Sequence, residues 1–246
     1  MQTEPADAFC RVLAEAAAGK DFFEREGYLV LRGALAPAVC AEAVDGFLAE
    51  VHLDTRALFL RSGPERYAAH CYTDTGRMRF PIVNLQDVCG RRYPQFKAAG
   101  LALLTDRALV RAVRTLLGEP ACLLRTMYCD GSGAAPMQQG ARIGAWIAAE
   151  DAWHPGATAL RQGDVLLWNA TAAGARWPPA VAACQQRALI GYYGARAQCR
   201  PRGCVTIGGI DVVLHGGRPT VAGRAAGALR TACPRLYALL QRRQAV

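Results

Sequence analysis

The sequence predicts a mainly antiparallel β protein, a sandwich or barrel with helices packed around it. Two stretches support this prediction, residues 143–149 (IGAWIAA) and residues 163–193. Both contain apolar, β-branched or aromatic runs of strand length interrupted by Gly or Pro, which is typical of buried strands. A chain of 246 residues with 52% hydrophobic composition can bury one large core. We therefore expect a single domain with a ligand in the mouth of its sheet.

The first part of the chain is predicted to be mostly helical. Apolar residues at helical spacing over 6–18 and 37–51 indicate two amphipathic helices. Between them, residues 21–33 are predicted to form a short helix that Gly27 ends, followed by a strand. Residues 52–94 contain several Gly and Pro turn signals, so we expect loops around a short strand near Phe80–Leu85.

A second helical pattern spans 96–117, and Thr105-Asp106 is predicted to divide it into two helices. A strand over 121–128 follows, and residues 205–214 are predicted to form a small hairpin around Gly208-Gly209. We expect the single domain to consist of a helical part over 1–120, a β core over about 121–215 and a C-terminal helix over 222–243.

The charge of the chain is strongly basic, with 29 Lys and Arg against 20 Asp and Glu and a formal net charge of +9. The basic residues are scattered singly or in pairs without interleaved aromatic residues, so no nucleic-acid partner is predicted. We interpret them as a solvated basic surface, with a basic pocket for an anionic substrate as the alternative. No apolar run has the length needed to span a bilayer.

Ten cysteines are spread along a chain that begins without a signal-peptide pattern. Reduced thiols and a cytoplasmic location are therefore expected. Cys199 and Cys204 form one pair without a second Cys or His pair nearby, so no zinc site is predicted.

Several stretches of the sequence resemble the phytanoyl-CoA dioxygenase-like family of iron(II)/2-oxoglutarate oxygenases. They are Asp21–Gly33, Ala145–Asp151, the Gly163-Asp164 strand entry that runs to Trp168, and Gln186–Leu189 with the following Tyr192-Tyr193. The resemblance implies a double-stranded β-helix, which is a jelly-roll, cupin-like barrel. Active members of that family use Fe(II) and 2-oxoglutarate as cofactors.

The metal-ligand positions of the family are occupied by other residues in this chain. The family's His-x-Asp pair corresponds to Gln138 and Gly140, and its third ligand, a His, corresponds to Ala173 or Gly174. A non-haem iron(II) site needs two imidazoles and a carboxylate on one face. A neutral amide is a poor ligand for iron(II) and glycine supplies none, so no metal site is predicted at these positions.

A second departure from the family is the short connection over 152–162. We expect the barrel to lack a strand there or to carry a very short one. An incomplete sheet would expose an edge, which predicts a homodimer formed through that edge.

One residue of the family's cofactor site is retained by this resemblance. Arg187 corresponds to the arginine that binds the distal carboxylate of 2-oxoglutarate, a role that suits the planar guanidinium. The alternative is an arginine at the surface or at the rim of the barrel. Trp146, Trp168 and Gln138 are expected to line the pocket.

Three functional hypotheses follow. The first is a degenerate family member, a pseudoenzyme with no cofactor, that binds a small molecule or a partner, or catalyses a metal-free step, in its barrel. The second is an active Fe(II)/2-oxoglutarate dioxygenase for a small or lipid-like substrate, with metal ligands drawn from His154, Asp151 and His70. The third is an interaction module whose open sheet edge pairs with another chain.

Overall fold

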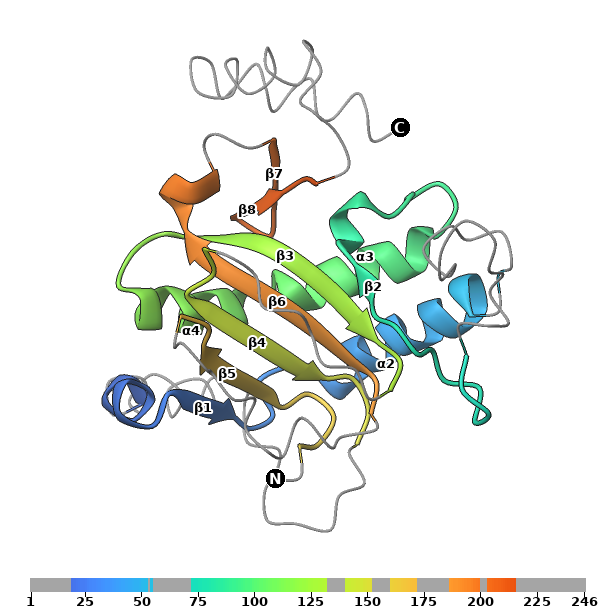
Figure 1. Ribbon diagram of the computed structural model, residues 1–246, viewed down its shortest axis with the longest axis horizontal. Helices are drawn as coiled ribbons and strands as arrows, with labels where there is room; N and C mark the ends of the chain where they lie inside the picture. Colours follow the sequence, from blue (N-terminus) through green and yellow to red (C-terminus); the bar gives the residue numbers. More distant parts are fainter. Residues whose placement is uncertain are drawn as a thin grey trace, which may run out of the picture.

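The sheet is the centre of the molecule (Figure 1). The structure is a computed structural model that describes residues 19–52, 54, 72–131, 140–151, 160–171, 186–199 and 203–215. Eight strands in these ranges form one mixed sheet in the order β1-β5-β4-β6-β3-β8-β7, and β2 pairs with β3 outside this path. The strands are β1 (Tyr28–Leu31), β2 (Ile82–Val83), β3 (Ala121–Cys129), β4 (Ile143–Ala148), β5 (Val165–Asn169), β6 (Ala188–Ala195), β7 (Cys204–Ile207) and β8 (Ile210–Val213).

Helices cover one face of this sheet, as Figure 1 shows. They are α2 (Pro37–Gly46), which continues into a π-helical turn (Phe47–Val51), α3 (Pro94–Leu104) and α4 (Arg107–Leu117). Residues 19–26 are also helical, and two 3-10 segments span Leu85–Asp87 and Arg196–Cys199. None of the described helices is long and apolar enough to cross a bilayer.

Local sequence signals explain where the helices begin and end. Pro stands in the first turn of α2 and of α3, where its missing N–H is not needed. The carboxylate of Asp106 accepts hydrogen bonds from the amides of Ala108 and Leu109 and so caps α4. Gly118 ends α4 at φ +70°, a conformation that favours glycine. The predicted division at Thr105-Asp106 is therefore confirmed.

The order of the central strands identifies the fold class. Four central strands are neighbours in the order β5, β4, β6 and β3, and each adjacent pair is antiparallel. The strands β3 and β4 follow each other in the chain, but β6 lies between them in the sheet. In a double-stranded β-helix, the chain alternates between two sheets. Strands that are neighbours in one sheet are therefore often not consecutive in the chain. The predicted fold class, mainly β with flanking helices and a jelly-roll strand order, is confirmed.

Three connections between strands of the sheet lie outside the described residues. They are residues 132–139, 152–159 and 172–185. Within the described part the sheet is open and ends in β1 and β7. The predicted helices over 6–18 and 222–243 also lie outside it, and the organisation as a single domain stays a prediction.

The sheet has two differently packed faces. Its helix face carries residues such as Tyr128, Leu189 and Tyr193, which are buried in one core with α2, α3 and α4. Its opposite face, called the inner face below, carries a second buried cluster that includes Met127, Trp146, Trp168, Ile190 and Tyr192. Because side chains alternate along a strand, the parity of a residue decides to which core it belongs.

The cysteines differ in part from the expectation of reduced thiols. Cys40, Cys89, Cys129 and Cys204 are free. Cys122 is disulfide-bonded, so the expectation is corrected there. Its partner is not among the cysteines whose side chains the structure describes.

Candidate functional site on the inner face

Aromatic side chains dominate the inner face. Trp146 and Tyr192 are each 1% exposed and Trp168 is 7% exposed. The rings of Trp168 and Tyr192 meet edge to face, with centroids 5.8 Å apart. Gly144 of β4 makes room for this arrangement, since a Cβ atom there would lie 2.1 Å from the Trp168 ring. The absence of a side chain at residue 144 therefore lets the indole lie across β4.

Gln186 is a buried polar residue that stands two positions before β6. It is 1% exposed, and neither its Nε2 nor its Oε1 has a hydrogen-bond partner. Gln186 precedes β6, whose residues Ala188, Ile190 and Tyr192 belong to the inner face. A buried amide without partners is energetically costly, so this side chain marks a place where a ligand or a water molecule would be bound.

Arg187, the predicted 2-oxoglutarate ligand, has the opposite parity and lies on the helix side of the sheet. Its Nε donates to Oδ1 of Asp130 at 2.7 Å, and its Nη1 donates to Oε2 of Glu150 at 3.1 Å. Its backbone N–H also donates to Glu150, at 2.8 Å. Arg77 joins the same two carboxylates, 3.0 Å from Glu150 and 3.6 Å from Asp130. Two arginines and two acids therefore neutralise each other at this end of the sheet.

Burial and neighbouring charges affect the pKa values of the groups in this network. The side chain of Asp130 is fully buried and accepts a further hydrogen bond from the backbone N–H of Met78. Burial opposes the charge of Arg187, but its hydrogen bond to Asp130 raises its pKa above the ordinary value. Burial and the nearby charge of Asp130 raise the pKa of Tyr128, so its phenol stays protonated. These contacts give Arg187 a structural role, and its role as a 2-oxoglutarate ligand stays a prediction.

The other predicted site residues are described only in part. Trp146 and Trp168 share the inner face, and their place in the lining of a pocket stays a prediction. Gly140 adopts φ +80° just before β4. Asp151, a weak alternative metal ligand, accepts a hydrogen bond from the backbone N–H of Gln162 at 2.8 Å. The remaining positions lie outside the described residues, namely His70, Gln138, His154, Ala173 and Gly174.

The residues present do not fit an iron(II) site of the family type. Gln138, Gly140 and Ala173 or Gly174 offer neither imidazole nor carboxylate at the three ligand positions. Among the described residues, no group of three or more His, Cys, Asp or Glu side chains could hold a metal ion.

Sequence reasoning missed Gln186 and the acidic partners of Arg187. The residues 186–193 offered no signal for Gln186, because Gln, Ala, Ile and Tyr alternate with Arg, Leu, Gly and Tyr. The pairing of Arg187 with Asp130 and Glu150 had no such signal, because the three residues lie on different strand ends 37 and 57 positions apart.

Comparisons with known proteins add the following. No protein-family model and no curated protein sequence matches the chain. Its structure is similar to the epimerase SnoN in complex with Fe3+, alpha ketoglutarate and nogalamycin RO, with 14% identity, a TM-score of 0.48 and coverage of 74% of this chain and 84% of that one. For AviO1 from Streptomyces viridochromogenes the identity is 15%, the TM-score 0.46 and the coverage 74% and 96%.

A further similar structure is HygX from Streptomyces hygroscopicus with nickel and 2-oxoglutarate bound. Here the identity is 14%, the TM-score 0.44 and the coverage 73% of this chain and 86% of that one. Similarity of this extent assigns none of these activities to the chain.

Proposed function

We propose that this chain is a phytanoyl-CoA dioxygenase-like protein that has lost iron-dependent hydroxylation and binds a small, largely apolar molecule against its inner face. The single observation that carries the proposal is the buried, unpartnered amide of Gln186 just before β6, the strand that carries Ala188, Ile190 and Tyr192 on the inner face. Pockets for small molecules are typically apolar with a few polar groups that orient the ligand. The inner face combines both features.

The chemistry of the inner face indicates the class of ligand. Trp146, Trp168 and Tyr192 offer apolar and aromatic surface for a flat or hydrocarbon group. The amide of Gln186 has both donor and acceptor atoms, so it suits a ligand carrying a carbonyl, an amide or a hydroxyl group. Arg125 of β3 is the register partner of Tyr192, and its charge acts against the rise of the pKa of Tyr192. A positive charge therefore lies close to the aromatic residues.

Two features support the loss of the oxygenase reaction. The ligand positions hold no imidazole or carboxylate, as described above. Arg187 donates to Asp130 and Glu150, so two of its side-chain donors are already engaged by carboxylates of the protein. A 2-oxoglutarate carboxylate would have to compete with both acids for this guanidinium.

A stability comparison tests the proposed role of Gln186. Replacing it with Met keeps the volume and removes the unpartnered amide, so Gln186→Met is expected to stabilise the free protein by about 1 kcal/mol. Gln86 provides a matched control, because it is 4% exposed and both ends of its amide are bonded, to Val213 O and to Thr126 Oγ1. Gln86→Met is therefore expected to destabilise the protein by about 1–3 kcal/mol.

Urea denaturation of both variants provides the measurement. If Gln186→Met destabilises the protein as much as Gln86→Met does, the Gln186 amide has a structural partner and the proposal is wrong.

Metal and 2-oxoglutarate binding give an independent test. Thermal unfolding is followed under anaerobic conditions with Fe(II) or Mn(II), with and without 2-oxoglutarate. A ligand that binds the native state raises its apparent stability, and no shift is expected here. A metal-dependent rise that 2-oxoglutarate enlarges would restore the oxygenase hypothesis, and replacing His70 or His154 with Ala would then show which imidazole binds the metal.

A further inference from the structure

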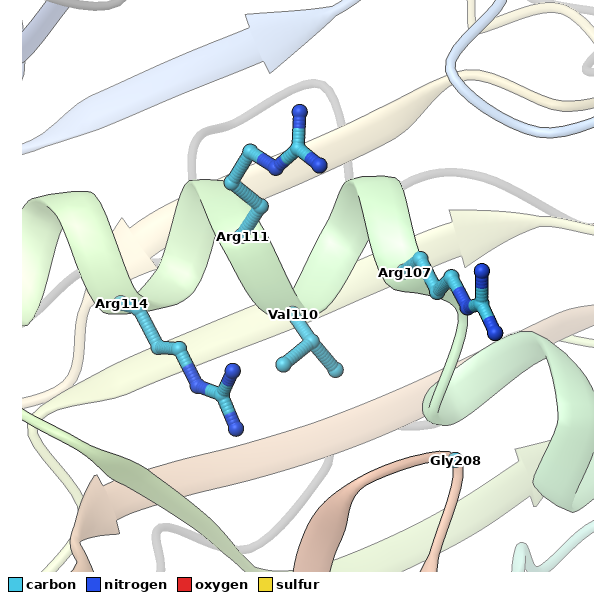
Figure 2. A pocket seen from close by; sticks show the side chains of 5 residues that line it. All are labelled: Arg107, Val110, Arg111, Arg114 and Gly208. Atoms are coloured by element: carbon cyan, nitrogen blue, oxygen red, sulfur yellow. The ribbon is translucent and has the colours of Figure 1, made fainter.

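A group of arginines lies on the outward side of α4, away from the inner face. Arg107, Arg111 and Arg114 are spaced by four and three residues, which brings them to one side of the helix. All three side chains are exposed. With Val110 and Gly208 they line a pocket of about 290 Å³. In Figure 2, Arg107 and Arg114 extend on either side of Val110 toward Gly208, while the side chain of Arg111 extends away from Gly208 in that view.

The wall opposite α4 is a tight turn from a distant part of the chain. Gly208 and Gly209 join β7 to β8 with φ +57° and +80°, as a two-residue turn with two positive φ angles requires. A Cβ atom on Gly208 would lie 2.6 Å from the carbonyl oxygen of Thr105, so the turn packs directly against the junction of α3 and α4. Nη2 of Arg114 donates to the carbonyl oxygen of Gly209 at 3.0 Å and ties the turn to the helix.

Two of the three arginines of the pocket, Arg107 and Arg114, carry charge that the described acids do not neutralise. Arg107 and Arg114 form no ion pair with any described carboxylate, and the recorded bond of Arg114 goes to a neutral carbonyl. The nearest acid in sequence, Asp106, bonds the amides of Ala108 and Leu109. In β8, Asp211 is already paired with Arg196 and Thr206. Since Asp106 accepts from the first free amides of α4, the guanidinium groups of Arg107 and Arg114 are the groups that remain to bind an anion.

We propose that this arginine pocket binds the phosphate or pyrophosphate group of a small phosphate ester. Guanidinium groups bind phosphate oxygens through paired, charge-assisted hydrogen bonds. A volume of about 290 Å³ is at the lower limit for ligand pockets, so it suits an anionic group rather than a whole nucleotide. The site is separate from the inner face and does not depend on the function proposed there.

Calorimetric titration of the full-length protein with pyrophosphate at 150 mM NaCl tests this site. The double variant Arg107→Gln/Arg111→Gln removes two guanidinium groups at exposed positions and leaves the Arg114 contact with the turn. Losing even one charge-assisted hydrogen bond corresponds to about tenfold in affinity, so Kd is expected to rise about tenfold or more. Orthophosphate is expected to bind through the same residues and more weakly, because it offers fewer oxygens.

A variant with the same change in net charge provides the control. Arg25 and Arg91 are exposed and lie outside the pocket, so Arg25→Gln/Arg91→Gln is expected to leave Kd unchanged within about twofold. Equal weakening in both double variants would mean that pyrophosphate responds only to net charge, and the proposal would be wrong. It would also be wrong if the unmodified protein did not bind pyrophosphate, or if a single-stranded oligonucleotide bound through these arginines while pyrophosphate did not.

Discussion

Gly144 and Trp168 show how one residue shapes the inner face. They are register partners on β4 and β5, and the indole lies where the side chain of residue 144 would be. Glycine normally weakens a strand, because it loses more conformational freedom on folding and has no side chain to pack. Here its small size is needed, since the neighbouring tryptophan occupies the space.

This close contact predicts the effect of a minimal substitution. Gly144→Ala is expected to destabilise the protein by about 2 kcal/mol or more, because the added Cβ atom would overlap the Trp168 ring. Gly90→Ala is the matched control, since its Cβ atom would meet only the flexible Lys97 side chain, at 3.4 Å. Its effect is expected to stay within about 0.5 kcal/mol. Urea denaturation monitored by tryptophan fluorescence measures both, and equal stabilities of the two variants would contradict the prediction.

At the scale of secondary-structure elements, Gly163 and Asp164 hold the β1 edge to the rest of the sheet. Gly163 adopts φ +88°, and a Cβ atom there would lie 2.3 Å from the carbonyl oxygen of Leu35. The carboxylate of Asp164 is 4% exposed and bonds Nη1 of Arg32 at 2.6 Å. It also accepts the backbone N–H groups of Gly33 and Arg161 at 2.8 and 2.9 Å. The Gly-Asp motif that carries the family resemblance thus has a structural task in this chain.

Removing the charge of Asp164 is expected to loosen this edge. Asp164→Asn loses the negative charge and one acceptor oxygen while three donors remain, so we expect a loss of about 2 kcal/mol of stability. Most of this cost comes from the two backbone amides, because Arg32 is half-exposed and its ion pair is screened by water. Exposed Asp45 on α2 is the control, and Asp45→Asn is expected to change stability by less than about 0.5 kcal/mol.

Hydrogen exchange of the β1 amides adds a local readout to the stability measurement. Asp164→Asn is expected to accelerate exchange in Tyr28–Leu31 more than in β6. Uniform acceleration in both strands would show that Asp164 stabilises the whole molecule and has no particular role at this edge.

For the whole molecule, buried thiols and phenols determine the response to alkaline pH. Burial raises the pKa of Cys40 to about 11 and the pKa values of Cys129 and Tyr192 to about 12. Burial also raises the pKa of Tyr193. The chain has only two lysines, Lys20 and Lys97, so few other side chains titrate in this range.

The sign of the pH dependence follows from these shifts. In the unfolded chain, thiols and phenols lose their protons at about pH 8.5 and 10, whereas the native protein keeps them. The native state therefore binds more protons, and its stability falls as pH rises above about 8.5 and continues to fall through about 11 and 12. Urea midpoints at pH 7.5, 9 and 10.5 are expected to decrease in this order.

A cysteine pair tests the origin of this dependence. Cys129→Ala is expected to reduce the loss of stability between pH 9 and 10.5, because it removes one buried thiol. Exposed Cys89 is the control, and Cys89→Ala is expected to leave the pH dependence unchanged. If the two variants follow the same curve, buried thiols do not account for the alkaline loss.

The predicted homodimer would form through an open edge of the sheet. In the described part of the chain, the sheet ends in β1 and β7, which have four residues each. Short edge strands are one means by which proteins limit pairing with other sheets. A homodimer formed through such an edge stays a prediction, which sedimentation velocity of the full-length protein would decide.

The sequence by itself determined the elements and the fold class. Apolar runs predicted the strands β3 to β6, and proline, Asp106 and Gly118 predicted where helices begin and end, because these signals act within a few residues of the chain. The tertiary structure alone decided which face each residue occupies. A shift of one residue moves a strand side chain to the other face, and this parity separates Ile190 and Tyr192 from Leu189 and Tyr193. The tertiary structure also decided the arginine pocket. The turn that forms one wall of this pocket lies about a hundred residues from α4 in the sequence, so no local pattern could predict that the two are in contact.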